Sequence, residues 1–126
     1  SLTLTPLPGQ YAVCQAEIGE VPEWALGGAL FSVTRTPAEL SIVCAEDDVP
    51  PGVKAERGWK ALRLEGPFEF TLTGVLLAVL SPLADAGIGI FALSTYDTDY
   101  VLVKAEHLVM AVAALRGAGH RVAGSE

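Results

Sequence analysis

The sequence has 126 residues, of which 51% are hydrophobic, and it carries a net charge of −7. A chain of this length buries roughly two thirds of its unfolded surface, so its core needs neither a disulfide nor a metal. It also lacks the excess of Lys and Arg with which proteins bind nucleic acids or anionic membranes, and we expect neither as a partner. The longest apolar stretch, residues 75–83, is much shorter than the ~20 residues of a membrane-spanning helix, so we expect a cytoplasmic protein.

The first half of the chain contains short apolar runs separated by turn residues, which is typical of strands. Gly27 and Gly28 end a single short helix. The stretch after the last strand is acidic and then rich in Pro and Gly, which indicates a linker. The predicted elements are a lead-in over residues 2–9, a strand over 10–16, the helix over 21–26, strands over 29–34 and 40–45, and the linker over 46–58.

The second half combines strands with amphipathic helices. Leu62 and Leu64 alternate with charged residues, which places both leucines on one face of a strand. Six apolar residues then recur at helical spacing, and Gly87 ends that helix. The predicted elements are a strand over residues 59–65, the helix with its stripe of Leu72, Val75, Leu76, Val79, Leu80 and Leu83, strands over 88–94 and 99–104, a helix over 105–116 and a strand over 120–123.

Two segments of the chain repeat each other. Residues 31–46 and 91–106 align without a gap, and each has a strand, a polar hairpin with an acid and a second strand. The alignment makes Phe31 equivalent to Phe91. The order strand, helix, strand, strand, helix, strand is the ferredoxin-like arrangement. We therefore predict an α+β fold of two tandem βαββαβ units: a reduced N-terminal unit with its linker over 1–58 and a C-terminal unit over 59–126.

The second unit resembles a known family. The run TGVLLAVLSPLADAGIGIFALSTYDTDYVLV, residues 73–103, is similar to the ACT domain, a regulatory module that binds amino acids. The segment STYDTDY, residues 94–100, is most similar to the paired ACT proteins of the CASTOR type, which sense arginine. This resemblance implies two tandem ACT-like units, a function in sensing rather than catalysis, and no cofactor.

A ligand site is expected where the first helix of this unit begins. Free N–H groups and the positive end of the helix dipole favour a carboxylate there, and Gly74 lets the backbone approach closely. The polar hairpin over residues 95–99 lies at the same edge in this fold and favours a cation. The resemblance implies that Asp99 meets the cationic side chain of the ligand. The expected ligand-binding residues are Leu72, Thr73, Gly74, Val75, Thr95, Tyr96, Thr98 and Asp99.

Each of these assignments has an alternative explanation. Asp97 and Asp99 are also typical hairpin residues, because Asp bonds its own backbone in turns. Gly74 also suits close packing of a helix. Glu69 occupies a position where the arginine sensor has a small residue, and its carboxylate would repel that of an amino acid. The ligand is therefore open, although a polar or basic amino acid suits the site.

Three classes of function remain from the sequence: an amino-acid-binding regulatory protein, a structural or protein-interaction module that has lost its ligand, and an enzyme. An enzyme is disfavoured because no His, Cys or Lys lies near Asp97 and Asp99. Cys14 and Cys44 fall in apolar strands, where a buried reduced thiol is expected, and no metal motif is present. Exposed edges of small sheets favour pairing, so we expect a homodimer.

Overall fold

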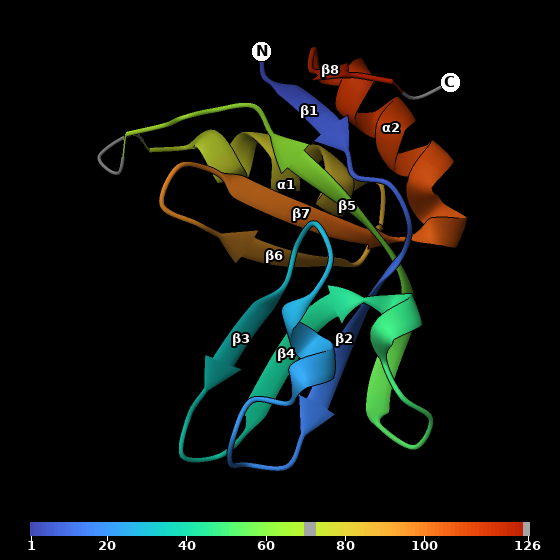
Figure 1. The fold of residues 1–126 in the computed structure, drawn as a ribbon. Coiled ribbons are helices and arrows are strands. Elements are labelled where there is room, and N and C mark those ends of the chain that lie inside the picture. The colour runs from blue at the N-terminus through green and yellow to red at the C-terminus, as the bar shows by residue number, and fades with distance from the viewer. Residues whose placement is uncertain (70–72, 125–126) are drawn as a thin grey trace. The chain divides into compact units, whose positions relative to one another are not determined.

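The computed structural model describes residues 1–69 and 73–124, drawn as a ribbon in Figure 1. The chain divides into two compact units. We call Gly9–Trp59 the N-terminal unit, and Ser1–Pro8 together with Lys60–Glu126 the C-terminal unit. Residues 1–8, which the sequence analysis assigns to the N-terminal unit over 1–58, lie with the C-terminal unit.

Eight strands, two α-helices and three 3₁₀ helices make up the described residues. In chain order they are β1 (Thr3–Pro6), β2 (Tyr11–Ala16), η1 (Glu23–Leu26), β3 (Ser32–Arg35), β4 (Leu40–Ala45), η2 (Glu46–Asp48), β5 (Lys54–Leu64), α1 (Val75–Asp85), β6 (Ile90–Ser94), β7 (Asp99–Lys104), η3 (Ala105–His107), α2 (Leu108–Gly117) and β8 (Arg121–Val122). Within residues 1–69 and 73–124, neither α-helix has the length and apolar character needed to cross a membrane.

The C-terminal unit contains a mixed sheet in the order β6-β7-β5-β1-β8. Strand β1 is antiparallel to β5, with Leu4 opposite Leu64, and parallel to β8, with Leu4 opposite Val122. The sequence predicts only a lead-in at β1, because four residues ending in a proline carry little strand pattern of their own. Its partners are remote in the chain, and their pairing makes the segment a strand.

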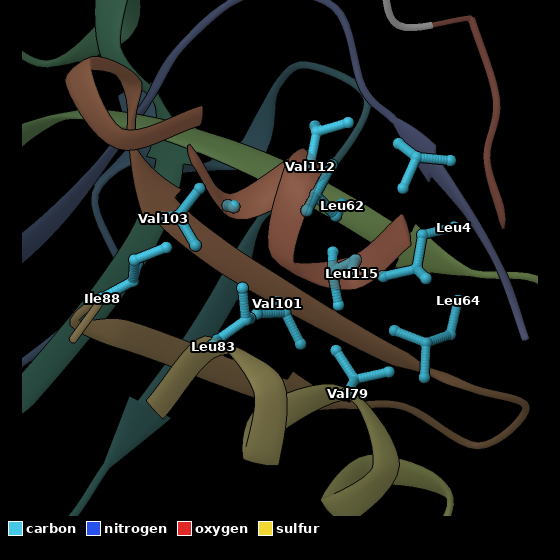
Figure 2. Close-up of a cluster of buried hydrophobic side chains, with 12 residues drawn as sticks. Leu4, Leu62, Leu64, Val79, Leu83, Ile88, Val101, Val103, Val112 and Leu115 are labelled. Atoms are coloured by element: carbon cyan, nitrogen blue, oxygen red, sulfur yellow. The ribbon is translucent and has the colours of Figure 1, made fainter. Parts of the chain in front are cut away.

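Helices α1 and α2 contact each other and supply one side of the core of this unit. Figure 2 shows Leu62 and Leu64 of β5 in the same apolar cluster as Val79 of α1, as their alternation predicts. Full burial of one such side chain contributes roughly 1.5–3 kcal/mol. The cluster consists of Leu4, Leu62, Leu64, Val79, Leu83, Ile88, Val101, Val103, Ala111, Val112, Leu115 and Val122.

Helix α1 follows the predicted apolar stripe. Val79 and Leu83 are fully buried, and Val75, Leu76 and Leu80 pack partly against the same cluster. The helix begins at Val75, and the stripe position Leu72 lies outside the described residues. Thus the amphipathic pattern places the buried face correctly.

A distant histidine replaces the hydrogen bond that a proline inside α1 removes. Pro82 has no N–H, so the carbonyl of Ala78, four residues earlier, lacks its usual helical partner. The Nε2 atom of His120 lies 2.8 Å from that carbonyl oxygen, and its Nδ1 accepts the N–H of Leu2 at 3.1 Å. With Nδ1 as acceptor, the proton is on Nε2, which donates to Ala78. The imidazole thus links α1 to the start of the chain.

The N-terminal unit is a reduced version of the same arrangement, with strand order β3-β4-β2-β5. In chain order, η1 lies between β2 and β3 as α1 lies between β5 and β6, and η2 follows β4 as η3 follows β7. A smaller cluster forms its core, with Ala12, Cys14, Ala25, Leu40, Ile42, Cys44 and Val49 buried. The predicted fold class, two ferredoxin-like units of which the first is reduced, is therefore confirmed.

The linker expected over residues 46–58 is wrong in its second half. Strand β5 begins at Lys54 and continues without a break to Leu64. Gly58 interrupts the sequence pattern but not the strand, because it has a φ of +81° where the register shifts between Tyr11 and Val13. Glycine with positive φ is typical of a β-bulge. One strand therefore serves both units.

The two hairpins match each other one residue away from the predicted alignment. Arg35 pairs with Leu40 across the first hairpin and Ser94 with Asp99 across the second, so equivalent residues are 59 apart. Strands β4 and β7, and the turns η2 and η3, agree at this spacing. The equivalence of Phe31 with Phe91 is therefore wrong, and a slip of one residue changes the face of the sheet on which a side chain lies.

Candidate functional site

A shallow pocket of about 180 Å³ lies in the C-terminal unit between the segment that follows β5, the start of α1 and the β6–β7 hairpin. Four of the eight residues expected at the site, Thr95, Tyr96, Thr98 and Asp99, come from the hairpin, and Val75 comes from the helix. Ser94 of the STYDTDY segment also lines it, as does Phe68, for which no sequence pattern predicts a role. The full lining is Phe68, Glu69, Val75, Ser94, Thr95, Tyr96, Asp97, Thr98 and Asp99.

Threonine side chains fix the shape of the hairpin. The Thr95 N–H donates to the Thr98 carbonyl at 2.8 Å, and the Thr95 hydroxyl accepts the Thr98 N–H at 3.3 Å. The equivalent turn of the N-terminal unit is built alike, since the Thr36 hydroxyl accepts the N–H of Glu39 at 3.1 Å. These bonds hold the four-residue loop without any need for its acids.

The hydroxyl of Thr98 bonds the protein backbone rather than facing a ligand. Its side chain is buried, and its hydroxyl donates to the Leu64 carbonyl at 2.6 Å, which joins the hairpin to β5. A hydroxyl with a partner at this distance has little to offer a ligand. Of the expected binding residues, Thr98 therefore positions the hairpin, whereas the ring of Tyr96, 79% exposed, lies at its tip.

The segment that follows β5 is hydrogen-bonded to the same hairpin. The Phe68 N–H donates to the Asp97 carbonyl at 2.8 Å. A Cβ atom on Gly66 would lie only 2.9 Å from that carbonyl oxygen, so a residue without a side chain is required here. This close approach brings Glu69 to the pocket, beside the acids of the hairpin.

The start of α1 has the form expected for an anion site. Gly74 is the N-cap residue of the helix, with a φ of +81°. Because glycine has no side chain, it makes no side-chain capping bond. The first helical bond in this segment is from Ala78 N–H to Gly74, at 3.0 Å, so the amides of Val75, Leu76 and Leu77 precede it. Such amides and the helix dipole attract negative charge.

Not all of the expected helix-start residues meet the pocket. Thr73 and Gly74 are exposed and do not line it, and Leu72 lies outside the described residues. No atom lies within 4 Å of a Cβ built on Gly74, so the reason for glycine is its positive φ and not a close approach of the backbone.

The charge of the pocket is negative. Glu69, Asp97 and Asp99 contribute three carboxylates, and no Lys or Arg is among the described residues that line it. Asp99 accepts a bond from the Ser94 hydroxyl at 2.6 Å, which orients its carboxylate across the hairpin. No group of three His, Cys, Asp or Glu side chains in the described part of the chain has the geometry to hold a metal ion. The arrangement can attract an organic cation.

Comparison with known proteins relates both units to established families. The ACT domain model matches residues 54–117, and a second family model, which describes an N-terminal domain, matches residues 9–52. Among curated proteins, human CASTOR3P is 35% identical over 86 residues, covering 58% of this chain and 53% of its own length. The bovine cytosolic arginine sensor for mTORC1 subunit 1 is 29% identical over 93 residues, covering 65% of this chain and 28% of the sensor. The chain thus spans about half the length of the first relative and less of the second.

Solved structures agree on the fold. A crystal structure of a protein from Agobacterium tumefaciens has a TM-score of 0.91 and 42% identity, covering 96% of this chain and 91% of that one. The ligand-free regulatory subunit of aspartate kinase from Thermus thermophilus has a TM-score of 0.61 at 14% identity, covering 87% of this chain and 93% of the subunit, a likeness of fold alone. Because the family model matches residues 54–117, from the start of β5 to the end of α2 and just over half of the chain, the chain belongs to the ACT domain family.

Proposed function

We propose that this protein binds a free amino acid and acts as a regulatory or sensor module rather than as an enzyme. The observation that carries the proposal is the pocket in which the start of α1 meets the acidic hairpin. Val75 and the neighbouring amides favour the ligand carboxylate, whereas Asp99 favours its cationic groups. The relatives named as arginine sensors support this choice of ligand class.

A basic side chain suits the pocket best. Three carboxylates without a lining Lys or Arg stabilise a second positive charge on the ligand more than a neutral side chain. Asp99 is the acid with the most defined orientation, since Ser94 holds it at 2.6 Å. We therefore expect arginine or lysine to bind more tightly than an uncharged amino acid.

The size of the pocket favours closure by another chain. Its volume of about 180 Å³ is below the ~300–1,000 Å³ of pockets that bury most of a small ligand. A second copy placed at this edge would supply the missing wall, so we propose a homodimer whose assembly and ligand binding depend on each other. The cytosolic naming of the bovine relative supports a cytoplasmic location.

A second candidate function is a protein-interaction module without a small ligand. Glu69 favours it, because this carboxylate lines the pocket and opposes an incoming carboxylate. The two candidates differ in one property, since only the first requires an amino acid to bind. A thermal-shift screen against the twenty amino acids separates them.

In that screen, a ligand at about 100 times its Kd stabilises the protein by about 2.7 kcal/mol, which raises Tm by several degrees. We expect this shift with a basic amino acid. The absence of a shift with all twenty, at concentrations up to ~10 mM, would favour the interaction module instead.

Calorimetry with the amino acid found in the screen then tests the site. Asp99→Ala should weaken binding by about 1–3 kcal/mol, because it removes a charged acceptor for the ligand cation. Asp85→Ala is the matched control: Asp85 is exposed at the end of α1 and does not line the pocket. Equal affinity of wild type and Asp99→Ala would remove Asp99 from the site. Gly74→Val is a poor test, since its positive φ makes any β-branched residue strained.

A further inference from the structure

A larger pocket lies entirely within the N-terminal unit. Its volume is about 520 Å³, within the range of sites that bury a small organic molecule. It is distinct from the hairpin site, since the two share no residue. The lining residues are Gln15, Ala16, Glu17, Glu20, Pro22, Trp24, Gly52, Val53 and Lys54.

The walls of this pocket come from elements that the core holds in place. Trp24 of η1 is partly buried and packs against the apolar cluster of the N-terminal unit, so one face of its indole is fixed. Gln15 of β2 pairs with Lys54 of β5, so the sheet holds both of these lining residues in place. The aromatic ring is therefore a rigid surface rather than a loose side chain.

The charges around the pocket are of both signs and are not used by the protein itself. Glu17 and Glu20 come from the loop after β2, whereas Lys54 comes from β5. Across the described residues, none of these three side chains takes part in an ion pair or hydrogen bond with another group. Two carboxylates beside an indole attract a cation, and a lysine attracts an anion.

We propose that this pocket is a second ligand site, which takes a small zwitterion. Its cationic group lies against the indole of Trp24 and the carboxylates of Glu17 and Glu20, and its carboxylate meets Lys54. This assignment does not rest on the proposed function, because no residue of the hairpin site contributes to it. The exposed charges predict millimolar affinity, since exposed ion pairs and cation–π contacts are each weak in water.

Two probes test the assignment: L-arginine and agmatine. Both carry a guanidinium and an ammonium group, but only arginine has a carboxylate. The readout is the indole N–H resonance of Trp24 in the full chain, assigned by its loss in Trp24→Phe. Arginine should shift this resonance saturably. Lys54→Gln should weaken arginine binding by up to about fivefold and leave agmatine no weaker, because only arginine has a carboxylate for the lysine.

The double change Glu17→Gln with Glu20→Gln should weaken both probes by several-fold. Glu23→Gln is the matched control, because Glu23 lies beside Trp24 in η1 but does not line the pocket. The full amide spectrum of each variant reports whether it is folded. A Trp24 resonance that does not move with arginine, or that moves equally in the double variant and in wild type, would overturn the proposal.

The two sites are told apart in the same experiment. Asp99→Ala should leave the response of Trp24 to arginine unchanged, whether or not an amino acid binds at the hairpin. Loss of the Trp24 response in Asp99→Ala would mean that the shift is a remote effect of the hairpin site, and would also overturn the second site.

Discussion

Cys44 shows how one buried residue makes stability depend on pH. Burial, together with the negative charge of a Cys14 thiolate, raises the pKa of its thiol from 9.0 to about 12. The protonated thiol is therefore retained in the fold at a pH where the unfolded chain has lost its proton. Below the unfolded pKa both states are protonated and the thiol makes no difference.

Between pH 9 and 12, stability should fall with rising pH by up to about 1.4 kcal/mol per pH unit from this group, because the native state binds more protons than the unfolded state. Urea unfolding at pH 8, 9 and 10 measures this slope. Cys44→Ala removes the titrating group, so its slope should be shallower than that of wild type. The same slope in both proteins would show that Cys44 does not titrate differently in the fold.

At the scale of one helix, Pro82 and His120 form a compensating pair. The imidazole donates to the Ala78 carbonyl, which Pro82 leaves without a helical donor. His120→Ala should cost about 2 kcal/mol, since it removes two hydrogen bonds and leaves the Leu2 N–H and the Ala78 carbonyl without partners. Denaturant unfolding measures this loss.

A double-mutant cycle identifies the cause. Pro82→Ala restores an N–H that can bond Ala78, so His120→Ala should cost about 1 kcal/mol less in that background. Pro37→Ala is the control proline, because Pro37 lies in the exposed hairpin of the other unit and should be additive with His120→Ala. Additivity in both cycles would contradict the compensating role of His120.

For the whole molecule, assembly is the property that follows from the sheet edges and the small hairpin pocket. Strand β6 pairs only with β7 among the described strands, which leaves one edge of the C-terminal sheet open. An open edge and a pocket with too few walls are both relieved by a second copy. We expect light scattering to give twice the mass of the 126-residue chain at tens of micromolar, roughly the range of a specific interface.

A ligand that binds between copies should also strengthen the dimer. Dilution of the protein with and without the amino acid checks this coupling, which must be reciprocal. A monomer in both conditions would mean that the hairpin pocket functions without a second chain.

The fold was predictable where local pattern and packing agree. Strands β4 and β7 have the bounds that the sequence predicts, because their apolar runs end at clear turn residues. Strand β1 was missed, since its pairing with β8 depends on residues more than a hundred positions away. The repeat in the sequence is shifted by one residue from the repeat in the structure. Chance identities such as Phe31 with Phe91 favour a spacing of 60 residues, whereas the turn residue Thr36 has Thr95 as its structural equivalent.

In the candidate sites, too, local sequence patterns predict some residues and tertiary contacts decide the others. The hairpin residues are predictable because a polar turn between apolar strands is a local signal, whereas Phe68 joins the pocket only through its tertiary contact with the hairpin. No sequence pattern predicts the pocket of the N-terminal unit. Trp24 has the sequence context of a core residue, and only the structure places its ring beside Glu17, Glu20 and Lys54.

An amino acid is proposed to bind where the start of α1 meets the β6–β7 hairpin. Amide chemical-shift mapping with the amino acid found in the thermal screen tests it most directly, since it locates the ligand without altering any residue. Binding at this site should give saturable shifts concentrated at Phe68 and Glu69, at Val75–Leu77 and at Ser94–Asp99. Saturable shifts that leave both the helix start and the hairpin unchanged would contradict it.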